Sequence, residues 1–371
     1  MSSNRSRVSA GVSSVLRAII PVILAIVVGG IIILAMGRDP FVFYSKIFQY
    51  GLTGTNWMRS LVLMAPLLII AVGLIIAFRG QLWNLGYGGQ FLLGAVVVSG
   101  FGPALFNAVP SAVATPVLLV GSAIVGALWT VIPAFLKARY GTNEIITSLV
   151  MSFIGVGVVN LLIKGPLKDH SQPIPQTNVL DSGDMLPYIF GTKVHVGFLL
   201  AILIALAFAF VLSRTAFGLR MDVFGASPQS ANHVGINATG MVFLVFALSG
   251  ALIGLAGGVD VLGHESYQRA NWDPHYGDAV MPFVFLARLN PIAVIPLIAF
   301  YAILATGGIL AAQQAGLNSD FLLVIVGLIL VFMTITEFVT SRRALGQGYL
   351  PTGLKRSVTS LFDSILRKGD R

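Results

Sequence analysis

Residues 61–78 read LVLMAPLLIIAVGLIIAF, a run of apolar side chains without a charge or a side-chain amide. A helix rises about 1.5 Å per residue, so this run approaches the roughly 30 Å thickness of a membrane hydrocarbon core. The sequence therefore predicts an all-α polytopic membrane protein with about ten transmembrane segments, some of them short or re-entrant. The other apolar runs lie at 18–36, 91–108, 112–136, 145–163, 194–212, 239–259, 279–287, 292–312 and 321–336.

The composition of the whole chain supports the same class of protein. Only 10% of the 371 residues are charged, whereas 56% are hydrophobic, and no polar block is long enough to form a soluble domain. We therefore expect one transmembrane domain over residues 1–371, with the lipid bilayer as its surroundings. The net charge of +9 comes from basic residues in loops and near the C-terminus, so we expect no nucleic-acid partner.

The distribution of the basic residues predicts the orientation. Sixteen of the 23 Lys and Arg residues fall on the face that holds both termini, and seven fall on the opposite face. Because cytoplasmic segments carry the excess of Lys and Arg, the chain is predicted to be N-in and C-in, in the cell membrane. This orientation gives a cytoplasmic N-terminus at 1–17, an external loop at 164–193, a cytoplasmic loop at 214–238 and a basic cytoplasmic tail at 340–371.

Three segments depart from the pattern of simple spans. The acidic and aromatic segment 39–44 is predicted to be an external loop after the first span. The run 279–287 covers about half a membrane thickness, so it is either a broken or a re-entrant helix. Residues 79–90, RGQLWNLGYGGQ, enter the next span through four glycines and several amides. Interrupted segments in corresponding halves of a transporter point to a central solute site and to an internal pseudo-repeat, although glycines also serve close helix packing.

Several catalytic and binding signals are missing from the sequence. No Asp, Glu, Lys or Arg lies near the middle of a predicted span, which argues against an ion-coupled carrier and favours an uncharged solute. The phosphate-binding motif GxxxxGK[ST] is absent, as are HExxH and GxSxG. The sequence has no cysteine, and its five histidines lack ligand spacing. We therefore expect no enzyme activity, no metal site and no cofactor in this chain, so that any ATP is bound by a partner.

Five motifs resemble the permease subunits of bacterial ATP-binding cassette (ABC) importers, in the branched-chain amino acid and ribose-like family that carries simple sugars and nucleosides. They are FRGQLWNLGYGGQFLLGA (78–95), GTNEIITSLVMSFI (141–154), GPL (165–167), GLRMDVFGASPQSANHVGIN (218–237) and LSGALIGLAGGVDVLG (248–263). The motif at 141–154, followed by GPLKD and a Pro-rich loop, is more similar to the nucleoside-type branch than to the ribose type. After Gly263 the similarity is looser.

The resemblance implies import of a nucleoside that an external solute-binding protein delivers, driven by two ABC ATPase subunits that bind ATP. A second permease subunit, identical or homologous, is expected because one cytoplasmic docking element offers half of a symmetric ATPase dock. The binding protein is either periplasmic or lipid-anchored. A ribose-like monosaccharide is the alternative solute. An ATP-independent carrier or channel, and a membrane enzyme or anchor, are the alternatives from other classes.

The resemblance and the residue chemistry together predict three sets of site residues. Aromatic faces and hydrogen-bonding side chains of the translocation pathway are expected at Trp83, Asn84, Gly86, Gly89, Gln90, Phe91, Ser148, Ser152 and Phe153. Exposed charges that dock the external binding protein are expected at Lys168, Asp169, Asp181, Asp184, Glu265 and Arg269. Coupling to the ATPase is expected at Arg220, Ser227, Pro228, Ser230, Ala231 and Gly235.

The coupling segment also has a physical signature of its own. Ser227 and Pro228 stand in the favoured cap and first positions of a helix, and Gly235 is a suitable stop. They predict a short helix over 228–234, although Ser227 stands where the resembling family has Asn. In that helix Ala231 is expected to face the partner subunit.

Overall fold

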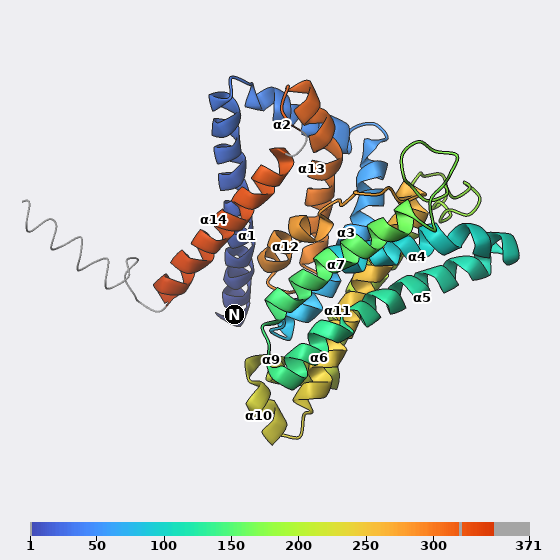
Figure 1. The fold of residues 1–371 in the computed structure, drawn as a ribbon. Helices are drawn as coiled ribbons and strands as arrows, with labels where there is room; N and C mark the ends of the chain where they lie inside the picture. Colours follow the sequence, from blue (N-terminus) through green and yellow to red (C-terminus); the bar gives the residue numbers. More distant parts are fainter. Residues whose placement is uncertain (1, 319–320, 345–371) are drawn as a thin grey trace, which may run out of the picture. The chain divides into compact units, whose positions relative to one another are not determined.

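The computed structural model describes residues 2–318 and 321–344, and in these ranges it consists of helices, connecting segments and two isolated β-bridges (Figure 1). The chain divides into two compact units, one of residues 33–323 and one that contains residues up to 32 and from 324 onward. The helices are α1 (Ser2–Ala35), α2 (Pro40–Leu52), α3 (Asn56–Arg79), α4 (Tyr87–Ala108), α5 (Ser111–Trp129), α6 (Val131–Tyr140), α7 (Glu144–Lys164), α8 (Gly197–Arg214), α9 (Ala216–Ala226), α10 (Pro228–His233), α11 (Ala238–Asp260), η1 (Val261–Glu265), α12 (Tyr276–Leu286), α13 (Val294–Gln314) and α14 (Phe321–Ala344).

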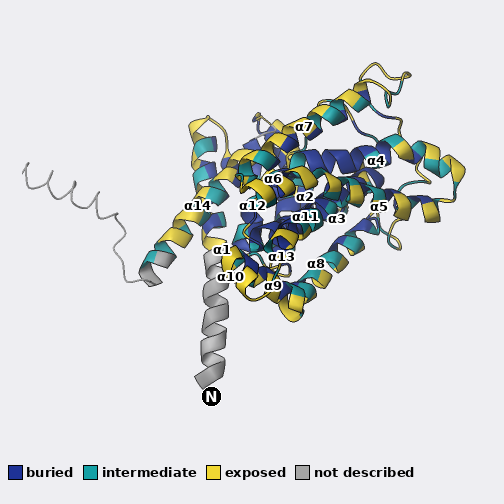
Figure 2. Ribbon diagram, turned by 60° about the horizontal axis from the view of Figure 1, so that its bottom comes forward, coloured by how far each residue is buried: buried dark blue, intermediate teal, exposed yellow. Residues whose placement is uncertain are grey.

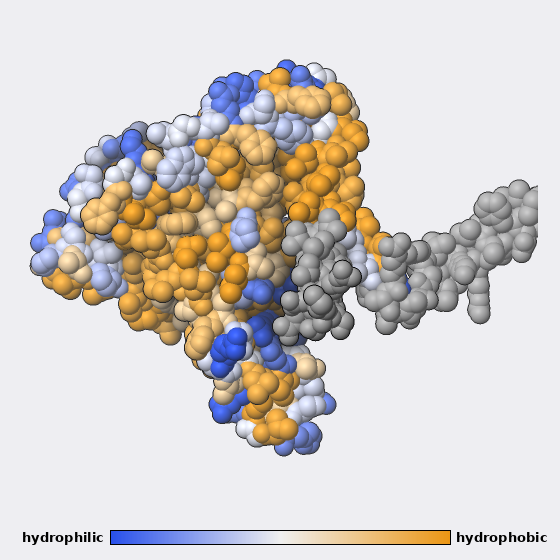
Figure 3. Space-filling view, turned by 180° about the vertical axis from the view of Figure 1, so that it is seen from behind, coloured by the Kyte–Doolittle hydropathy of each residue, from blue (hydrophilic) through white to orange (hydrophobic). Residues whose placement is uncertain are grey.

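Every predicted span coincides with a helix. Within the part of the chain that the structure describes, eight helical segments are long and apolar enough to cross a membrane, and residues 19–35 and α12 are shorter apolar helices. The prediction of an all-α polytopic membrane protein is therefore confirmed. The span expected at 112–136 is longer, because α5 and α6 follow one another across Thr130 as far as Tyr140. Figure 3 shows apolar side chains over a broad part of the surface, with hydrophilic side chains gathered toward its ends.

The loop predicted at 39–44 is wrong, because this segment begins α2. The Asp39 carboxylate accepts hydrogen bonds from the backbone N–H groups of Phe41 (2.8 Å) and Val42 (3.4 Å), and Pro40 is the first helical residue. An Asp cap followed by Pro is a common helix start. Asp39 and Pro40 therefore start a helix, although the acidic and aromatic composition of the segment suggested a loop.

In unit 33–323, α3 lies at the centre of the packing. It contacts α8, α11, α12 and α13, and 89% of its most apolar stretch is buried (Figure 2). Helix α11 lies beside α3 and also packs against α4 and α5. A Cβ atom at Gly254 of α11 would lie 2.9 Å from the Cα atom of Gly126 and would contact the Ser122 carbonyl oxygen. Backbone-to-backbone contact through small residues, which is typical of membrane helices, holds this crossing together.

The external loop predicted at 164–193 lies along the segment that follows η1. The Thr177 N–H donates to the Gln268 carbonyl (3.0 Å), the Gln268 N–H donates to Thr177 Oγ1 (3.0 Å), and the Leu186 N–H donates to the Leu262 carbonyl (2.8 Å). The structure therefore joins two segments that are far apart in the sequence and were both predicted to be external.

The two termini were predicted to be cytoplasmic extensions. Helix α1 begins at Ser2, so residues 2–17 continue into the first span as one helix. Helix α14 extends to Ala344, which makes residues 340–344 of the predicted tail helical. The remainder of that tail lies outside the described residues.

Candidate functional site

The connection between α3 and α4 is a tight turn followed by extended backbone. Gln81 adopts a left-handed conformation (φ 54°), and the Leu82 N–H donates to the Ala77 carbonyl (3.0 Å). This bond closes the C-terminal turn of α3 in the way that a left-handed residue after a helix permits. The chain then runs without helix until α4 begins at Tyr87.

Asn84 and Gln90 form a closed pair of side-chain amides within this connection. Asn84 Nδ2 donates to Gln90 Oε1 (3.0 Å) and to Ser249 Oγ (2.9 Å), and Gln90 Nε2 donates to Asn84 Oδ1 (2.9 Å). Both side chains are buried, with relative exposures of 0% and 1%. In this conformation the two amides bind one another and α11, so their assignment to the solute pathway stays a prediction.

Two serines of α7 satisfy backbone groups of the same connection. The Leu85 N–H donates to Ser148 Oγ (3.0 Å), and the Gly89 N–H donates to Ser152 Oγ (2.9 Å). A Cβ atom at Gly89 would lie 2.8 Å from the Ser152 carbonyl oxygen, and one at Gly86 would lie 3.1 Å from Asn84 Oδ1. The structure thus brings these pathway residues together, and it gives both glycines a role in close packing, which was the alternative interpretation of the motif.

Gln90→Leu is expected to destabilise the protein by about 1–3 kcal/mol, because the buried Asn84 amide loses its two hydrogen bonds to Gln90 and keeps only those to Ser249 and the Gly86 N–H. The thermal unfolding midpoint of the detergent-purified protein measures this effect. The double variant Asn84→Leu with Gln90→Leu also removes the acceptor of the buried Gly86 N–H and the partner of Ser249, so it is expected to be at least as destabilised as Gln90→Leu. A Gln90→Leu protein that unfolds at the wild-type midpoint would contradict the role assigned to the pair.

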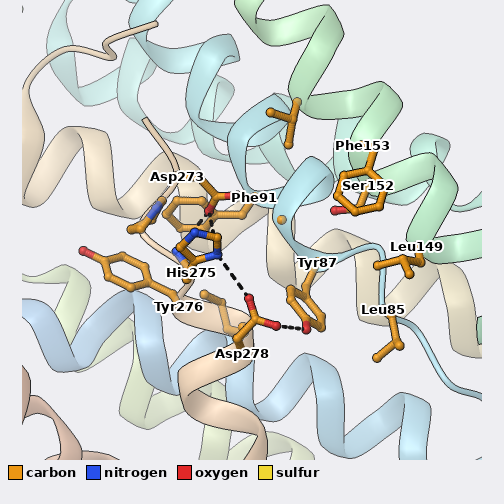
Figure 4. A pocket seen from close by; sticks show the side chains of 15 residues that line it. Leu85, Tyr87, Phe91, Leu149, Ser152, Phe153, Asp273, His275, Tyr276 and Asp278 are labelled. Carbon is orange, nitrogen blue, oxygen red and sulfur yellow. Dashed lines mark hydrogen bonds and ion pairs between the residues drawn. The ribbon is translucent and has the colours of Figure 1, made fainter. Parts of the chain in front are cut away.

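A cavity of about 180 Å³, here named the inner cavity, lies between α4, α7 and the start of α12 (Figure 4). Three predicted pathway residues, Phe91, Ser152 and Phe153, line it. Because small-molecule sites usually exceed roughly 300 Å³, the inner cavity in this conformation is too small to enclose a sugar or a nucleoside completely. Its wall combines aromatic faces with hydroxyl and carboxylate groups.

One side of the inner cavity carries a polar network that the sequence analysis missed. The Tyr87 hydroxyl donates to one Asp278 carboxylate oxygen, while the other oxygen lies 3.3 Å from His275 Nδ1 (Figure 4). The backbone N–H of His275 donates to Asp273 Oδ1 (3.0 Å). The sequence DPHYGD at 273–278 could have indicated this network, since it places several polar side chains directly before an apolar helix.

A second cavity, here named the outer cavity, borders the other side of residues 273–276 and has a volume of about 570 Å³. It lies toward the external end of α3 and beside α13. Aromatic, cationic and acidic side chains share its wall, namely Trp272, Tyr276, Tyr301, Arg59, Arg269, His264 and Glu265. This volume is within the range of small-molecule sites, and such a wall offers both stacking faces and hydrogen-bonding groups.

Trp83, one of the predicted pathway residues, lines neither of these two cavities. Its ring packs at 5.0 Å from the ring of Phe78 and at 5.7 Å from the ring of Phe285, measured between centroids. Its relative exposure is 37%. The structure therefore places Trp83 in an aromatic cluster of α3 and α12.

The loop at 214–238, which was predicted to be cytoplasmic, folds as predicted at its tip. Ser227 Oγ accepts the Ser230 N–H (3.2 Å), α10 begins at Pro228, and Gly235 has a φ of 81°, which glycine adopts readily. However, Ala231 is fully buried within the chain itself, so the expectation that it faces a partner is corrected. The exposed residues of this tip include Pro228, Gln229, Ser230, Asn232, His233 and Val234, and Arg220 of α9 is also exposed.

Helix α9 holds this tip against the end of α3 through an ion pair that the sequence analysis did not identify. Arg79 Nε and Nη2 donate to the two carboxylate oxygens of Asp222, at 2.6 and 2.8 Å. Gly225 lies against the same end of α3, since a Cβ atom there would be 2.7 Å from the Arg79 carbonyl oxygen. Asp222 is the one acidic residue between 214 and 238, and this could have indicated that it pairs with a basic residue.

The residues predicted to dock an external protein differ in their availability. Asp181 is exposed, whereas Asp184 accepts a hydrogen bond from Ser111 Oγ (3.0 Å). Hydrogen bonds from the Ser171 hydroxyl and backbone N–H lower the pKa of Asp169, which keeps this carboxylate charged at neutral pH. Glu265 is partly buried beside His264 (3.2 Å) and Arg269 (4.0 Å). Lys168 is half-buried on the same loop, and the docking role of all six residues stays a prediction.

Comparison with known proteins gives a family and several relatives. Residues 56–334 match the family model described as the permease component of the branched-chain amino acid transport system. A glucose ABC transporter permease of Haloferax volcanii is 28% identical over 86% of this chain and 87% of its own length. A guanosine ABC transporter permease of Bacillus subtilis is 27% identical over 69% and 74%, and a nucleoside ABC transporter permease of Lactococcus lactis subsp. cremoris is 26% identical over 86% and 91%. No solved structure matches the chain.

Proposed function

The chain belongs to the family of branched-chain amino acid transport permease components, and we propose that it imports nucleosides as the membrane subunit of an ABC transporter. Members of this family are transport proteins of the cell membrane and not enzymes. The observation that carries the proposal is the match over residues 56–334 together with relatives that transport sugars and nucleosides. The ATP that drives import is bound by partner ATPase subunits.

The choice of nucleosides is supported by the guanosine and nucleoside permeases among the relatives and by the outer cavity. A nucleoside has an aromatic base that stacks on a ring such as Trp272 or Tyr301. It also has ribose hydroxyls and base edges that pair with charged groups such as Glu265 and Arg269. We propose that the solute enters the outer cavity and then passes residues 273–276 toward the inner cavity.

Three partners complete the proposed transporter. An external solute-binding protein delivers the nucleoside to the side of the 164–193 loop, and ATPase subunits engage the tip around α10. A second permease subunit, identical or homologous, supplies the other half of the ATPase dock, because this chain offers a single such tip.

A monosaccharide is the second candidate solute, since a glucose permease is 28% identical over 86% of the chain. Hydroxyl groups of a sugar fit the same carboxylates and guanidinium groups, and its apolar face packs on aromatic rings as a base does. The two candidates therefore differ in the solute and share the mechanism.

Uptake by the complete complex in proteoliposomes tests the proposal. The permease, its ATPase and its binding protein are reconstituted together, and radiolabelled guanosine, adenosine, ribose and glucose are compared with and without ATP inside. We expect ATP-dependent accumulation of nucleosides at least tenfold above that of the sugars. Accumulation of glucose or ribose instead would establish the second candidate, and equal uptake without ATP would reject an ABC importer.

A further inference from the structure

The contact between α9 and α3, here named the α9–α3 joint, consists of two independent parts. The first is the two-point ion pair, in which the planar guanidinium of Arg79 faces both oxygens of Asp222 and so fixes direction as well as distance. The second is the close approach of Gly225 to the Arg79 carbonyl and to Gly80. Residues that approach this closely through backbone atoms have little freedom to slide past one another.

The joint lies directly before the turn that leads into α4. The left-handed Gln81 follows Arg79 by two residues, and Asn84 follows by five. From Asn84, hydrogen bonds reach Gln90 at 3.0 Å and Ser249 of α11 at 2.9 Å. The Leu85 and Gly89 N–H groups continue the connection to Ser148 and Ser152 of α7, and Ser152 lines the inner cavity.

We propose that the Arg79–Asp222 pair transmits movement of the cytoplasmic tip to the α3–α4 connection and through it to the wall of the inner cavity. Arg79 and Asp222 are therefore positioning residues for coupled transport. The route passes through the end of α3, which is far from α9 in the sequence, and not only through α8 and α11, which flank the tip. This inference rests on the proposed ATP-driven function.

Charge exchange at the pair tests the proposal in the reconstituted complex. Asp222→Ala and Arg79→Ala are each expected to lower the amount of solute imported per ATP hydrolysed at least fivefold, while the ATPase subunits still co-purify with the permease. Asp222→Asn retains the size of the side chain and is expected to fall between wild type and Asp222→Ala. The exchanged pair, Arg79→Asp with Asp222→Arg, is expected to regain at least half of the wild-type ratio.

The Lys137–Glu144 ion pair provides the matched control, because it also joins two neighbouring helices at 2.7 Å, α6 and α7, neither of which belongs to the tip. Lys137→Gln is expected to change the ratio less than twofold. Wild-type import per ATP in Asp222→Ala overturns the proposal, as does loss of ATPase co-purification, which would assign the pair to assembly. An exchanged pair that stays uncoupled also overturns it. Failure of the proposed function is distinguishable, because the wild-type complex would then show no ATP-driven uptake.

Discussion

Gly254→Leu is expected to abolish the folded protein. A side chain at this position would enter the space occupied by the Ser122 carbonyl and by the Gly126 backbone, 2.9 Å away, and neither atom belongs to a flexible side chain. Gly94 of α4 also packs directly against the Gly254 backbone, so a third helix takes part in this crossing. The substitution therefore separates three helices, with a cost at or above the roughly 3 kcal/mol upper end that is usual for overpacking.

The amount of monodisperse protein in detergent, relative to total membrane expression, measures this loss. Gly157→Leu is the matched control, because it makes the same change in the interior of a spanning helix where no atom lies within 4 Å of the added Cβ. The control is expected to retain wild-type yield. A Gly254→Leu protein that is recovered as well as the control would show that the glycine crossing is not what holds α11 in place.

Val234→Glu is expected to abolish ATPase association and solute uptake while the permease itself remains folded. Val234 follows α10 and is 68% exposed, so its side chain is apolar surface at the tip of the cytoplasmic loop. Figure 3 shows an apolar patch among hydrophilic residues on the projecting lower end of the molecule. A carboxylate buried without a partner in a subunit contact costs several kcal/mol, so we expect co-purification of the ATPase to fall at least tenfold.

Phe190→Glu is the control for this charge, because Phe190 is a fully exposed apolar residue of the external loop. It is expected to leave ATPase co-purification unchanged. Normal co-purification of the Val234→Glu permease would place the ATPase contact elsewhere. Uptake that persists without any bound ATPase would instead indicate a carrier or channel.

The spans were predictable because each needs only a run of apolar residues, and the tip at 228–233 was predictable because its cap and stop residues are adjacent in the sequence. The α2 helix shows a limit of composition, since Asp39 and Pro40 signalled a helix start within residues that were interpreted as a loop. Those signals were local, and giving them more weight would have identified the helix.

The side-chain partners could not be derived in the same way. Asn84 and Gln90 were predicted to be pathway residues, but only the fold shows that they bind each other and that Asn84 binds Ser249, 165 residues away. Ala231 lies in the predicted helix, yet which face of so short a helix turns inward depends on how α9 and α11 hold it. Asp222 and Arg79 are 143 residues apart, and their pairing follows from the packing of α9 on α3.

Helix α3 is the most apolar of the eight spans and is also the most enclosed, whereas α8 is mostly exposed at its surface. The apolar side chains of α3 thus contact mainly neighbouring helices and not lipid acyl chains. A change in bilayer thickness or fluidity acts first on helices such as α8, and reaches α3 only after the surrounding helices have shifted. Helix α3, whose end is paired with α9 of the tip, is therefore expected to respond less to the lipid composition of the membrane than the exposed helices do.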